Sequence, residues 1–464
     1  MRVLIVGAGR VGESVAESLV SEANDITVID PDAARIAILQ DRLDLRGVVG
    51  LGTSIQTLRE AGADDAELLV ACATSDETNL VVSRIGRDVF NIPTRIVRVR
   101  SSEFQEHEAL TRDGFAADVV ICPEQSVTNT ILKLVEFPEA LQVLEFAEGR
   151  VSLVAVRAVE GGALVRQRIR ELRDHLPGID VRVVTIYRAQ RAMIPDGETI
   201  IEPGDEVFVL AQTKHLRRLI RELRTIDKPV RRIMIAGGGN IGTRLAQALQ
   251  SDYNLRVIDR NPRTTQRLAT QLSSSALVLE GDATDEDLLT DESVQEMDLF
   301  MAVTNDDENN IMAALLAKRL GARRVIALIN RKAYADMMQG SRIDIAIAPS
   351  QATIGDLLTH IRRGDVARVH SLRRGAAEAL EAIAHGDRNS SKVVGRRIDQ
   401  IDLFAAERGV TVGALVRGEG EDAEVIIAHH DTVIEAEDHV IVFVNNKRLV
   451  PKVEKLFQVS AGFF

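Results

Sequence analysis

The sequence has little cysteine and no long apolar run. Only Cys72 and Cys122 occur in 464 residues, and both lie in apolar stretches where a free cysteine behaves as a small hydrophobic residue. This pattern excludes a disulfide framework and indicates a reducing compartment. No stretch reaches the roughly 18 apolar residues of a membrane-spanning helix, and no secretory leader pattern opens the chain. We therefore expect a cytoplasmic protein without spanning segments.

Catalytic signatures are also missing. Histidines share no helix-face spacing, so no metal site is indicated, and Gly-x-Ser-x-Gly, P-loop and Cys–His patterns are absent. A net charge of −12 does not favour nucleic acid as a ligand, because nucleic-acid-binding proteins usually carry a basic stripe. With 45 % apolar and 27 % charged residues, the composition is that of a globular protein long enough for three or four domains.

An internal repeat organises the chain. Residues 1–12 reappear as residues 231–242, at an offset of 230, and the same offset relates residues 74–76 to 304–306 and Asn79 to Asn309. Residues 200–210 also reappear as 433–443, and each of these segments indicates a strand, a turn and a strand before a basic amphipathic helix. The order is thus one large lobe and one small lobe, twice.

Short apolar runs alternate with helical stretches in each large lobe, which indicates βαβ units and a parallel sheet covered on both faces. We predict an α/β protein with two tandem Rossmann-like, doubly wound lobes, each followed by a small α+β lobe. The predicted domains are residues 1–125, 140–225, 231–350 and 368–456. Strands are expected at 3–6, 26–30, 48–49, 68–73, 95–99 and 118–121, and helices at 12–21, 33–41, 55–61 and 79–88.

The strongest ligand signal is a G-x-G-x-x-G motif between a predicted strand and a predicted helix. The first glycine permits the tight turn, the second lets a pyrophosphate approach the backbone, and the third packs helix against strand. Free N–H groups and the helix dipole then hold the phosphates. The predicted contacts are Gly7, Ala8, Gly9, Arg10, Val11 and Gly12 in the first copy, and Gly237, Gly239, Asn240, Ile241 and Gly242 in the second.

An acidic residue follows each motif at the distance that a dinucleotide fold requires. Asp30 and Asp259 stand 18 and 17 residues past the last glycine of their motifs. Both are predicted to accept hydrogen bonds from ribose hydroxyls, and their charge favours NAD-type over NADP-type ligands. An N-cap role, before Pro31 or before Asn261-Pro262, is the alternative and is compatible with ribose binding.

More contacts are predicted where later strands end, because ligands of such folds bind at the carboxyl edge of the sheet. Ala73 and Thr74 follow the fourth strand of the first copy, and Thr304 follows that of the second. Helix N-capping alone would also select such polar residues. Asp282 ends the third strand of the second copy and is predicted to border an adenine.

The two predicted sites differ in composition. Arg10 stands in the first loop where Asn240 stands in the second, and it either pairs with a phosphate or is a solvated surface arginine. Leu51 occupies the position of Asp282. Arg98 ends the fifth strand opposite Ala327 in an ungapped alignment, and lies either near the phosphates or an interface or on an exposed edge.

Two functions are compatible with these sites. The first is a nucleotide-binding regulator. The alternative is an NAD-dependent dehydrogenase, which needs an acid or base near the nicotinamide. No acid–base constellation is found, and two nucleotide sites per chain suit sensing better than turnover. The residues therefore favour binding over catalysis.

The chain also resembles the RCK (regulator of potassium conductance) family, in particular the regulatory A subunits of bacterial Trk potassium-uptake systems, built from two RCK modules. The resemblance covers essentially the whole chain. Its motifs are Gly7-Ala8-Gly9, residues 61–66, Ser75-Asp76-Glu77-Thr78-Asn79, residues 146–149, residues 302–308, Ser371-Leu372-Arg373-Arg374-Gly375 and Val394-Gly395-Arg396. Arg10 and Leu51 depart from the side chains that other members can carry, which affects ligand preference.

The resemblance implies a cytoplasmic regulator that is not an enzyme and that lies peripherally on the inner face of the cell membrane. It implies a homo-oligomer, a tetramer forming a ring of RCK modules, docked on a separate potassium-translocating membrane subunit. NAD(H) and ATP or ADP are the implied ligands. Carried over to this sequence, the ligand positions are 7–11, Asp30, Ala73, Thr74 and Arg98, then the loop from Gly237, Asp259 and the Thr304 region.

Overall fold

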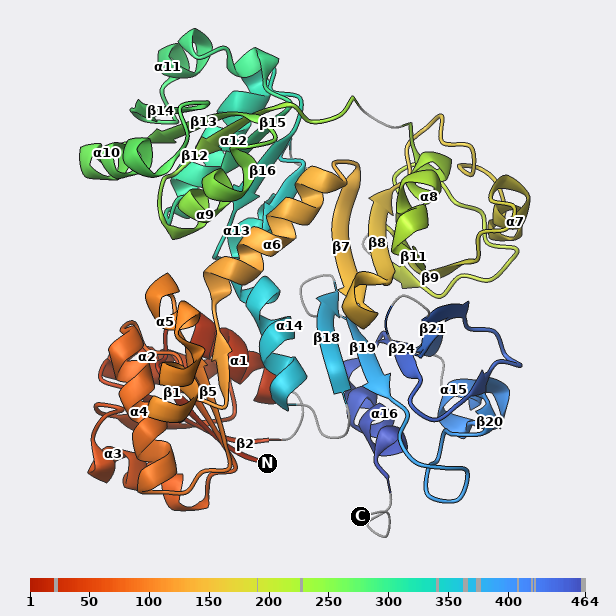
Figure 1. Ribbon diagram of the computed structural model, residues 1–464, viewed down its shortest axis with the longest axis horizontal. Helices are drawn as coiled ribbons and strands as arrows, with labels where there is room; N and C mark the ends of the chain where they lie inside the picture. The colour runs from red at the N-terminus through yellow and green to blue at the C-terminus, as the bar shows by residue number, and fades with distance from the viewer. Residues whose placement is uncertain are drawn as a thin grey trace.

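The computed structural model describes residues 1–20, 24–189, 191–225, 228–338, 342–361, 366–372, 377–406, 409–418, 420 and 423–459. Four lobes are arranged around a central pair of helices (Figure 1). This is the predicted α/β architecture, with two Rossmann-like lobes that alternate with two smaller α+β C-lobes. Ser21, Arg373, Arg374 and Gly375, which belong to segments singled out in the sequence, lie outside the described residues.

The first Rossmann-like lobe is a six-stranded parallel sheet in the order β3-β2-β1-β4-β5-β6. Its apolar, β-branched strands are buried because crossover helices cover both faces. The strands are β1 (Arg2–Val6), β2 (Asp25–Asp30), β3 (Arg46–Val49), β4 (Leu68–Ala71), β5 (Thr94–Arg98) and β6 (Val119–Ile121). The helices are α1 (Arg10–Val20), α2 (Ala33–Arg42), α3 (Ile55–Glu60), α4 (Asp76–Asp88) and α5 (Ser102–Glu106).

Two helices begin earlier than the sequence predicted. α1 starts at Arg10, inside the glycine motif, and α4 starts at Asp76 instead of Asn79. The reason at α4 is capping, since Ser75 Oγ accepts a hydrogen bond from Thr78 N at 3.2 Å. The polar run after β4 is therefore the first turn of a helix.

The first C-lobe contains an antiparallel sheet in the order β10-β9-β11-β8-β7. Its strands are β7 (Ala140–Phe146), β8 (Val151–Arg157), β9 (Val181–Arg188), β10 (Arg191–Met193) and β11 (Glu206–Gln212). Its helices are α7 (Leu172–His175) and the basic amphipathic α8 (Leu216–Leu223). The strand predicted from Ile200 is wrong, because Ile200 forms only an isolated bridge with Arg168 before β11.

The second half repeats this plan with sheet orders β14-β13-β12-β15-β16-β17 and β18-β19-β24-β21-β22. Its Rossmann-like lobe comprises β12 (Arg232–Ala236), α9 (Asn240–Leu249), β13 (Asn254–Asp259), α10 (Pro262–Gln271), β14 (Ala276–Glu280), α11 (Glu286–Asp291), β15 (Leu299–Ala302), α12 (Asp307–Leu320), β16 (Val325–Leu328), α13 (Lys332–Met337) and β17 (Ile345–Ile347). Its C-lobe comprises β18 (Val366–Leu372), β19 (Ala377–Ile383), β20 (Arg396–Arg397), α15 (Asp402–Ala406), β21 (Val410–Arg417), β22 (Glu424–Ile427), β23 (Val433–Ile434), β24 (His439–Val444) and α16 (Val450–Phe457).

The two halves interlock through their connecting helices, α6 (Pro123–Glu136) and α14 (Pro349–Ile361), which pack against each other near the centre of the molecule (Figure 1). α6 also packs against α9, the helix that begins at the second glycine loop. α14 packs against α1, the helix that begins at the first glycine loop. Each half therefore contacts the phosphate-loop helix of the other half.

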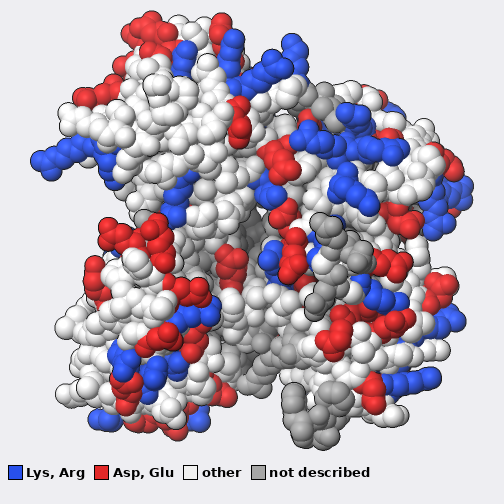
Figure 2. Space-filling view, viewed as in Figure 1, with Lys and Arg blue, Asp and Glu red and all other residues white. Residues whose placement is uncertain are grey.

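A cavity of about 1590 Å³ lies between these connecting helices and the C-lobe strands β7 and β18. Figure 2 shows the molecule hollowed between the lobes, with acidic and basic side chains intermixed over this face. No residue of either glycine motif lines this cavity, so it is separate from the predicted nucleotide sites. Within the described residues, no helix is both long and apolar enough to cross a membrane.

Candidate nucleotide-binding sites

The first glycine motif forms a tight turn between β1 and α1. Gly7 has a φ of 110°, in the left-handed region that favours glycine, and its N–H donates to Ile29 O at 2.8 Å. A Cβ on Gly12 would lie 1.9 Å from Gly7 O, so this position tolerates no side chain. A Cβ on Gly9 would meet nothing within 4 Å. The loop thus has an open side at Gly9, where a phosphate can approach the backbone.

The second motif reproduces this turn between β12 and α9. Gly237 has a φ of 111° and donates to Ile258 O at 2.8 Å. A Cβ on Gly242 would lie 1.8 Å from Gly237 O, while one on Gly239 would meet nothing within 4 Å. The two glycine loops therefore have the same backbone conformation and the same contacts.

Asp30 is buried at the end of β2 and holds the first loop in place. Its Oδ2 accepts from Ala8 N at 2.7 Å, and its Oδ1 accepts from Asp32 N at 2.9 Å. Asp259 does the same for the second loop, with Gly238 N at 2.7 Å and Asn261 N at 2.8 Å. Each carboxylate oxygen keeps a further lone pair that a ribose hydroxyl can use.

The alternative N-cap role of these two aspartates is wrong. The N-cap of α2 is Asp32, whose Oδ1 accepts from Ala34 N at 2.9 Å, and the N-cap of α10 is Asn261, whose Oδ1 accepts from Arg263 N at 3.0 Å. Asp30 and Asp259 end the strands that pair with β1 and β12. The glycine loops follow β1 and β12, so the two carboxylates lie beside these loops. The carboxylates therefore hold the loop backbone, and ribose binding by them stays a prediction.

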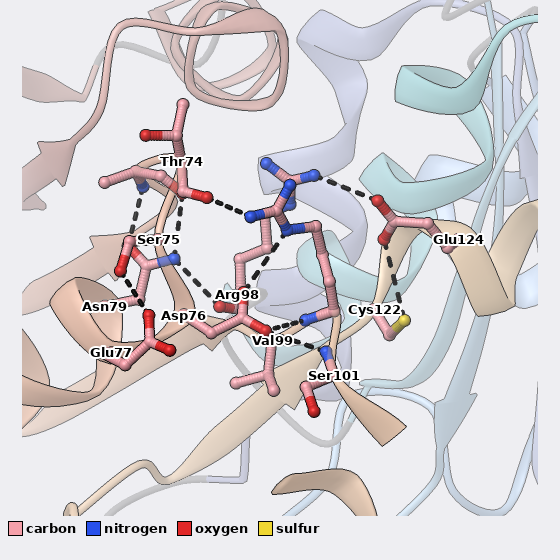
Figure 3. A network of polar contacts seen from close by, with 12 residues as sticks. Thr74, Ser75, Asp76, Glu77, Asn79, Arg98, Val99, Ser101, Cys122 and Glu124 are labelled. Atoms are coloured by element: carbon pink, nitrogen blue, oxygen red, sulfur yellow. Dashed lines mark hydrogen bonds and ion pairs between the residues drawn. The ribbon is translucent and has the colours of Figure 1, made fainter. Parts of the chain in front are cut away.

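Asn79 joins the ends of two neighbouring strands below Thr74 (Figure 3). Its Oδ1 accepts from Ala73 N at 2.7 Å, and its Nδ2 donates to Ala73 O at 3.1 Å and to Arg98 O at 3.0 Å. Asn79 is fully buried, so it fixes the backbone that lines the site. Sequence reasoning placed Asn79 in the repeat but missed this role.

The residue equivalent to Asn79 is Asn310, and the predicted pairing with Asn309 is wrong. Asn310 Oδ1 accepts from Thr304 N at 2.9 Å, and its Nδ2 donates to Leu328 O at 2.9 Å. Thr304 therefore corresponds to Ala73. Arg98 corresponds to Leu328 and not to Ala327, because the carbonyls of Arg98 and Leu328 each accept a hydrogen bond from the equivalent asparagine.

Arg98 extends from the end of β5 toward the start of α6. Its Nη2 lies 3.2 Å from Glu124 Oε1, and the two side chains face each other in Figure 3. Arg98 Nε is buried without a hydrogen-bond partner among the described residues. Arg98 is thus an interior ion-pair partner of the connecting helix, and the exposed-edge alternative is wrong.

A second ion pair, between Arg100 Nε and Asp76 Oδ1 at 3.5 Å, lies at the same edge. Asp76 Oδ2 accepts from Arg100 N and Ser101 N, both at 2.8 Å, and Arg100 donates to Thr74 O. Asp307 makes the equivalent backbone contact with Arg331 N at 2.8 Å. These first-turn aspartates hold the loop after the fifth strand.

The remaining predicted residues lie at the same edges. Arg10 and Asn240 are exposed at the first helical position, and Val11 and Ile241 are half-buried beside them. Asp282 forms an ion pair with Arg260, with Nη2 to Oδ1 at 2.6 Å. Beneath the first loop, burial raises the pKa of the Cys72 thiol to about 12, so this cysteine is a neutral core residue. No cluster of potential metal ligands occurs among the described residues.

Comparisons with known proteins show the family of this chain. The TrkA-N domain model matches residues 3–123 and 233–349, and the TrkA-C domain model matches residues 153–224 and 388–458. The chain belongs to the TrkA family. It is 50 % identical to the Trk system potassium uptake protein TrkA of Halomonas elongata, and 44 % identical to that of Haemophilus influenzae, over the whole of each chain.

Solved structures show that this chain has the fold of RCK domains. The crystal structure of the GsuK RCK domain superposes with a TM-score of 0.60 at 17 % identity, over 98 % of this chain and 94 % of that one. The GsuK channel bound to NAD gives a TM-score of 0.59 at 16 % identity, over 98 % and 79 %. The predicted fold and family resemblance are confirmed.

Proposed function

We propose that this TrkA-family chain is a nucleotide-sensing regulatory subunit of potassium uptake, without catalytic activity of its own. In this proposal NAD(H) and ATP or ADP bind at the two glycine loops. The phosphates lie on the open N–H groups at Gly9 and Gly239, and the riboses lie on Asp30 and Asp259. The other proposed contacts are Gly7, Ala8, Arg10, Val11, Gly12, Ala73, Thr74, Arg98, Gly237, Asn240, Ile241, Gly242, Asp282 and Thr304.

The observation that carries the proposal is the duplicated loop geometry. In each copy a left-handed glycine, an open glycine and a buried aspartate on the loop amide form one unit. A domain that needed only a stable fold would have no reason to keep both open glycines. The names of the relatives support potassium uptake, and the NAD bound to the structurally similar GsuK channel supports the ligand class.

Regulation in this proposal runs through the connecting helices. A nucleotide shifts the arrangement of the lobes only by its differential affinity for two states. Because α6 and α14 each contact the phosphate-loop helix of the other half, a shift of either loop changes the packing of both halves. A tetrameric ring of such chains, docked on the cytoplasmic face of a potassium-translocating membrane subunit, passes this motion to the pore.

The deciding experiment combines binding with transport. Calorimetric titration of the full chain with NAD, NADH, ATP and ADP is expected to give two sites per chain. Proteoliposomes with the membrane subunit are then expected to show potassium flux that changes with nucleotide only when this chain is present. Nucleotide binding without any effect on flux would contradict the regulatory role. Steady NADH turnover that depends on a small-molecule substrate would instead support a dehydrogenase.

A further inference from the structure

The base ends of the two sites lie at the third strand of each sheet. The glycine loop follows the first strand, and the ribose aspartate ends the second strand. In the sheet orders β3-β2-β1 and β14-β13-β12, a nucleotide that runs from phosphate to ribose continues toward β3 or β14. The residues just after these strands therefore meet the base.

The backbone after the third strand is the same in both copies. Gly50 N donates to Asp30 O, and Gly281 N donates to Asp259 O, both at 3.0 Å. The next turn is closed by Ser54 N to Leu51 O and by Asp285 N to Asp282 O, again both at 3.0 Å. Leu51 and Asp282 thus occupy equivalent positions in the two copies. At this position the two base subsites differ only in the side chain.

The first subsite is apolar at this position. Leu51 is 61 % exposed, and Ile55 beside it, the first residue of α3, is 44 % exposed. Pro31 follows the ribose aspartate. These side chains can cover the face of a base but have no polar group to read its edge.

The second subsite is charged, with Asp282 and Arg260 at the positions of Leu51 and Pro31. Asp282 Oδ1 takes the ion pair with Arg260 and hydrogen bonds from Thr284 N at 2.8 Å and Thr284 Oγ1 at 2.7 Å. No described residue donates to Oδ2. Partial desolvation raises the pKa of Asp282, but the Arg260 and Thr284 hydrogen bonds outweigh it and leave the pKa below its ordinary range. Oδ2 is therefore a fixed, ionised acceptor.

We propose that the second site recognises the 6-amino group of adenine through Asp282, whereas the first site binds the base by apolar contact at Leu51 without reading that group. This inference rests on the proposed nucleotide-sensing function. The Asp282 side chain is 43 % exposed without a ligand, and a base bound against it displaces the water there. An analogue that lacks the amino donor then leaves the carboxylate unpaired, which lowers its affinity. The first site has no such acceptor to leave unpaired.

The test compares ADP with purine riboside 5′-diphosphate, which carries hydrogen in place of the 6-amino group. Each site is measured alone in the full-length chain by calorimetry, after the other is blocked with Gly9→Asp or Gly239→Asp. Both positions have open space for a side chain and a backbone outside the left-handed region, so the variants are expected to fold. The added carboxylate occupies the phosphate position and repels the ligand.

The second site is expected to prefer ADP by roughly 10- to 100-fold, as for one hydrogen bond to a charged group. The first site is expected to bind both ligands within about threefold. Asp282→Leu, which copies the first site, should abolish the preference of the second site, and Leu51→Asp should create one at the first. Asp282→Asn keeps the shape of the side chain and should retain a preference of a few-fold, because a neutral hydrogen bond is weaker.

Equal affinities of the two ligands at the second site would overturn the inference while leaving nucleotide sensing intact. An Asp282→Leu variant that keeps the full preference would overturn it as well. If neither ligand bound at either site, the proposed function and this inference would both be wrong.

Discussion

At the residue scale, the glycines of each loop differ in the space around them. Gly12 and Gly242 lie against the carbonyls of Gly7 and Gly237, while Gly9 and Gly239 face open space. The motif therefore contains glycines of two kinds, one required for the fold and one that leaves room for a ligand. Substitution by alanine is therefore expected to lower stability at the first kind of glycine and to leave it unchanged at the second.

Gly12→Ala is expected to destabilise the chain by roughly 1–3 kcal/mol, because its Cβ would lie 1.9 Å from a backbone oxygen and the loop would have to move. Gly9→Ala is the matched control and is expected to leave the free energy of unfolding unchanged. Urea unfolding of both variants measures the difference. Equal stabilities would show that the loop shifts at little cost.

Arg10→Asn, which copies the second loop, is expected to weaken ATP binding at the first site more than NAD binding. Arg10 is exposed at the start of α1, so a charge-assisted contact with extra phosphate charge there changes affinity only a few-fold. The variant is titrated in a chain whose second site is blocked at Gly239. An unchanged ratio of ATP to NAD affinity would identify Arg10 as a solvated surface residue.

At the element scale, α6 and α14 exchange contacts between the halves. Arg244, one turn into α9, donates to Gln125 Oε1 at the start of α6 at 2.7 Å and to Arg100 O at 3.2 Å. Arg100 in turn donates to Thr74 O at the first site. The helix that begins at the second glycine loop is thus linked to the sheet edge of the first site.

Arg244→Ala is expected to reduce the coupling between the two nucleotide sites. Ligand-induced coupling in proteins is typically about 1–3 kcal/mol, and the loss of Arg244 should remove part of it. The coupling is measured as the change in ligand affinity at the first site when the second is occupied. Arg263→Ala, on the exposed side of α10, is the matched control. Identical coupling in wild type and Arg244→Ala would exclude this route.

At the scale of the whole molecule, the two C-lobes meet in a shared apolar core around Phe146, Leu210 and Phe443. Among the polar contacts that cross this interface in the described residues, one involves the buried carboxylate of Glu381. Glu381 Oε2 accepts from Ala147 N of the first C-lobe at 2.9 Å, and Glu381 Oε1 lies 2.6 Å from His439 Nδ1. The joint between the C-lobes therefore contains a titratable pair.

The pH dependence of this joint follows from the two pKa directions. The Glu381 hydrogen bond raises the pKa of His439 above its ordinary 6.5, so the contribution of His439 is complete below that pH and is lost as pH rises through the raised value. Burial raises the pKa of Glu381, but His439 and Ala147 N outweigh it and leave that pKa below 4.5. The contribution of Glu381 is therefore present above pH 4.5 and is lost as pH falls.

His439→Gln is expected to lower the free energy of unfolding more at pH 6 than at pH 9, because glutamine can hydrogen-bond to Glu381 but carries no charge. The charge of neighbouring Glu148 raises the pKa of His439 and the charge of Arg150 lowers it. The difference in unfolding free energy between the two pH values should therefore be modest. Denaturant unfolding at both pH values measures this difference. A loss that is the same at pH 6 and pH 9 would contradict the charged pair.

The sequence by itself determined the features that depend on local pattern. Strand and helix alternation, the repeat at Gly7 and Gly237, and the spacing to Asp30 and Asp259 follow from periodicity and backbone geometry, and these are fixed over a few residues. The asymmetry between Leu51 and Asp282 was also visible, because each follows the glycine that comes directly after the third predicted strand of its copy.

Only the tertiary structure decided which residues are equivalent and which of them touch. The matches of Asn79 with Asn310 and of Arg98 with Leu328 rest on hydrogen bonds between strands. The offset between the copies is 231 for the asparagines and 230 for the strand ends, so no single ungapped alignment gives both. The exchange of α6 and α14 between halves, the Arg98–Glu124 pair and the Arg244 link join segments far apart in the chain. Such contacts follow from how the lobes pack, which no local pattern encodes.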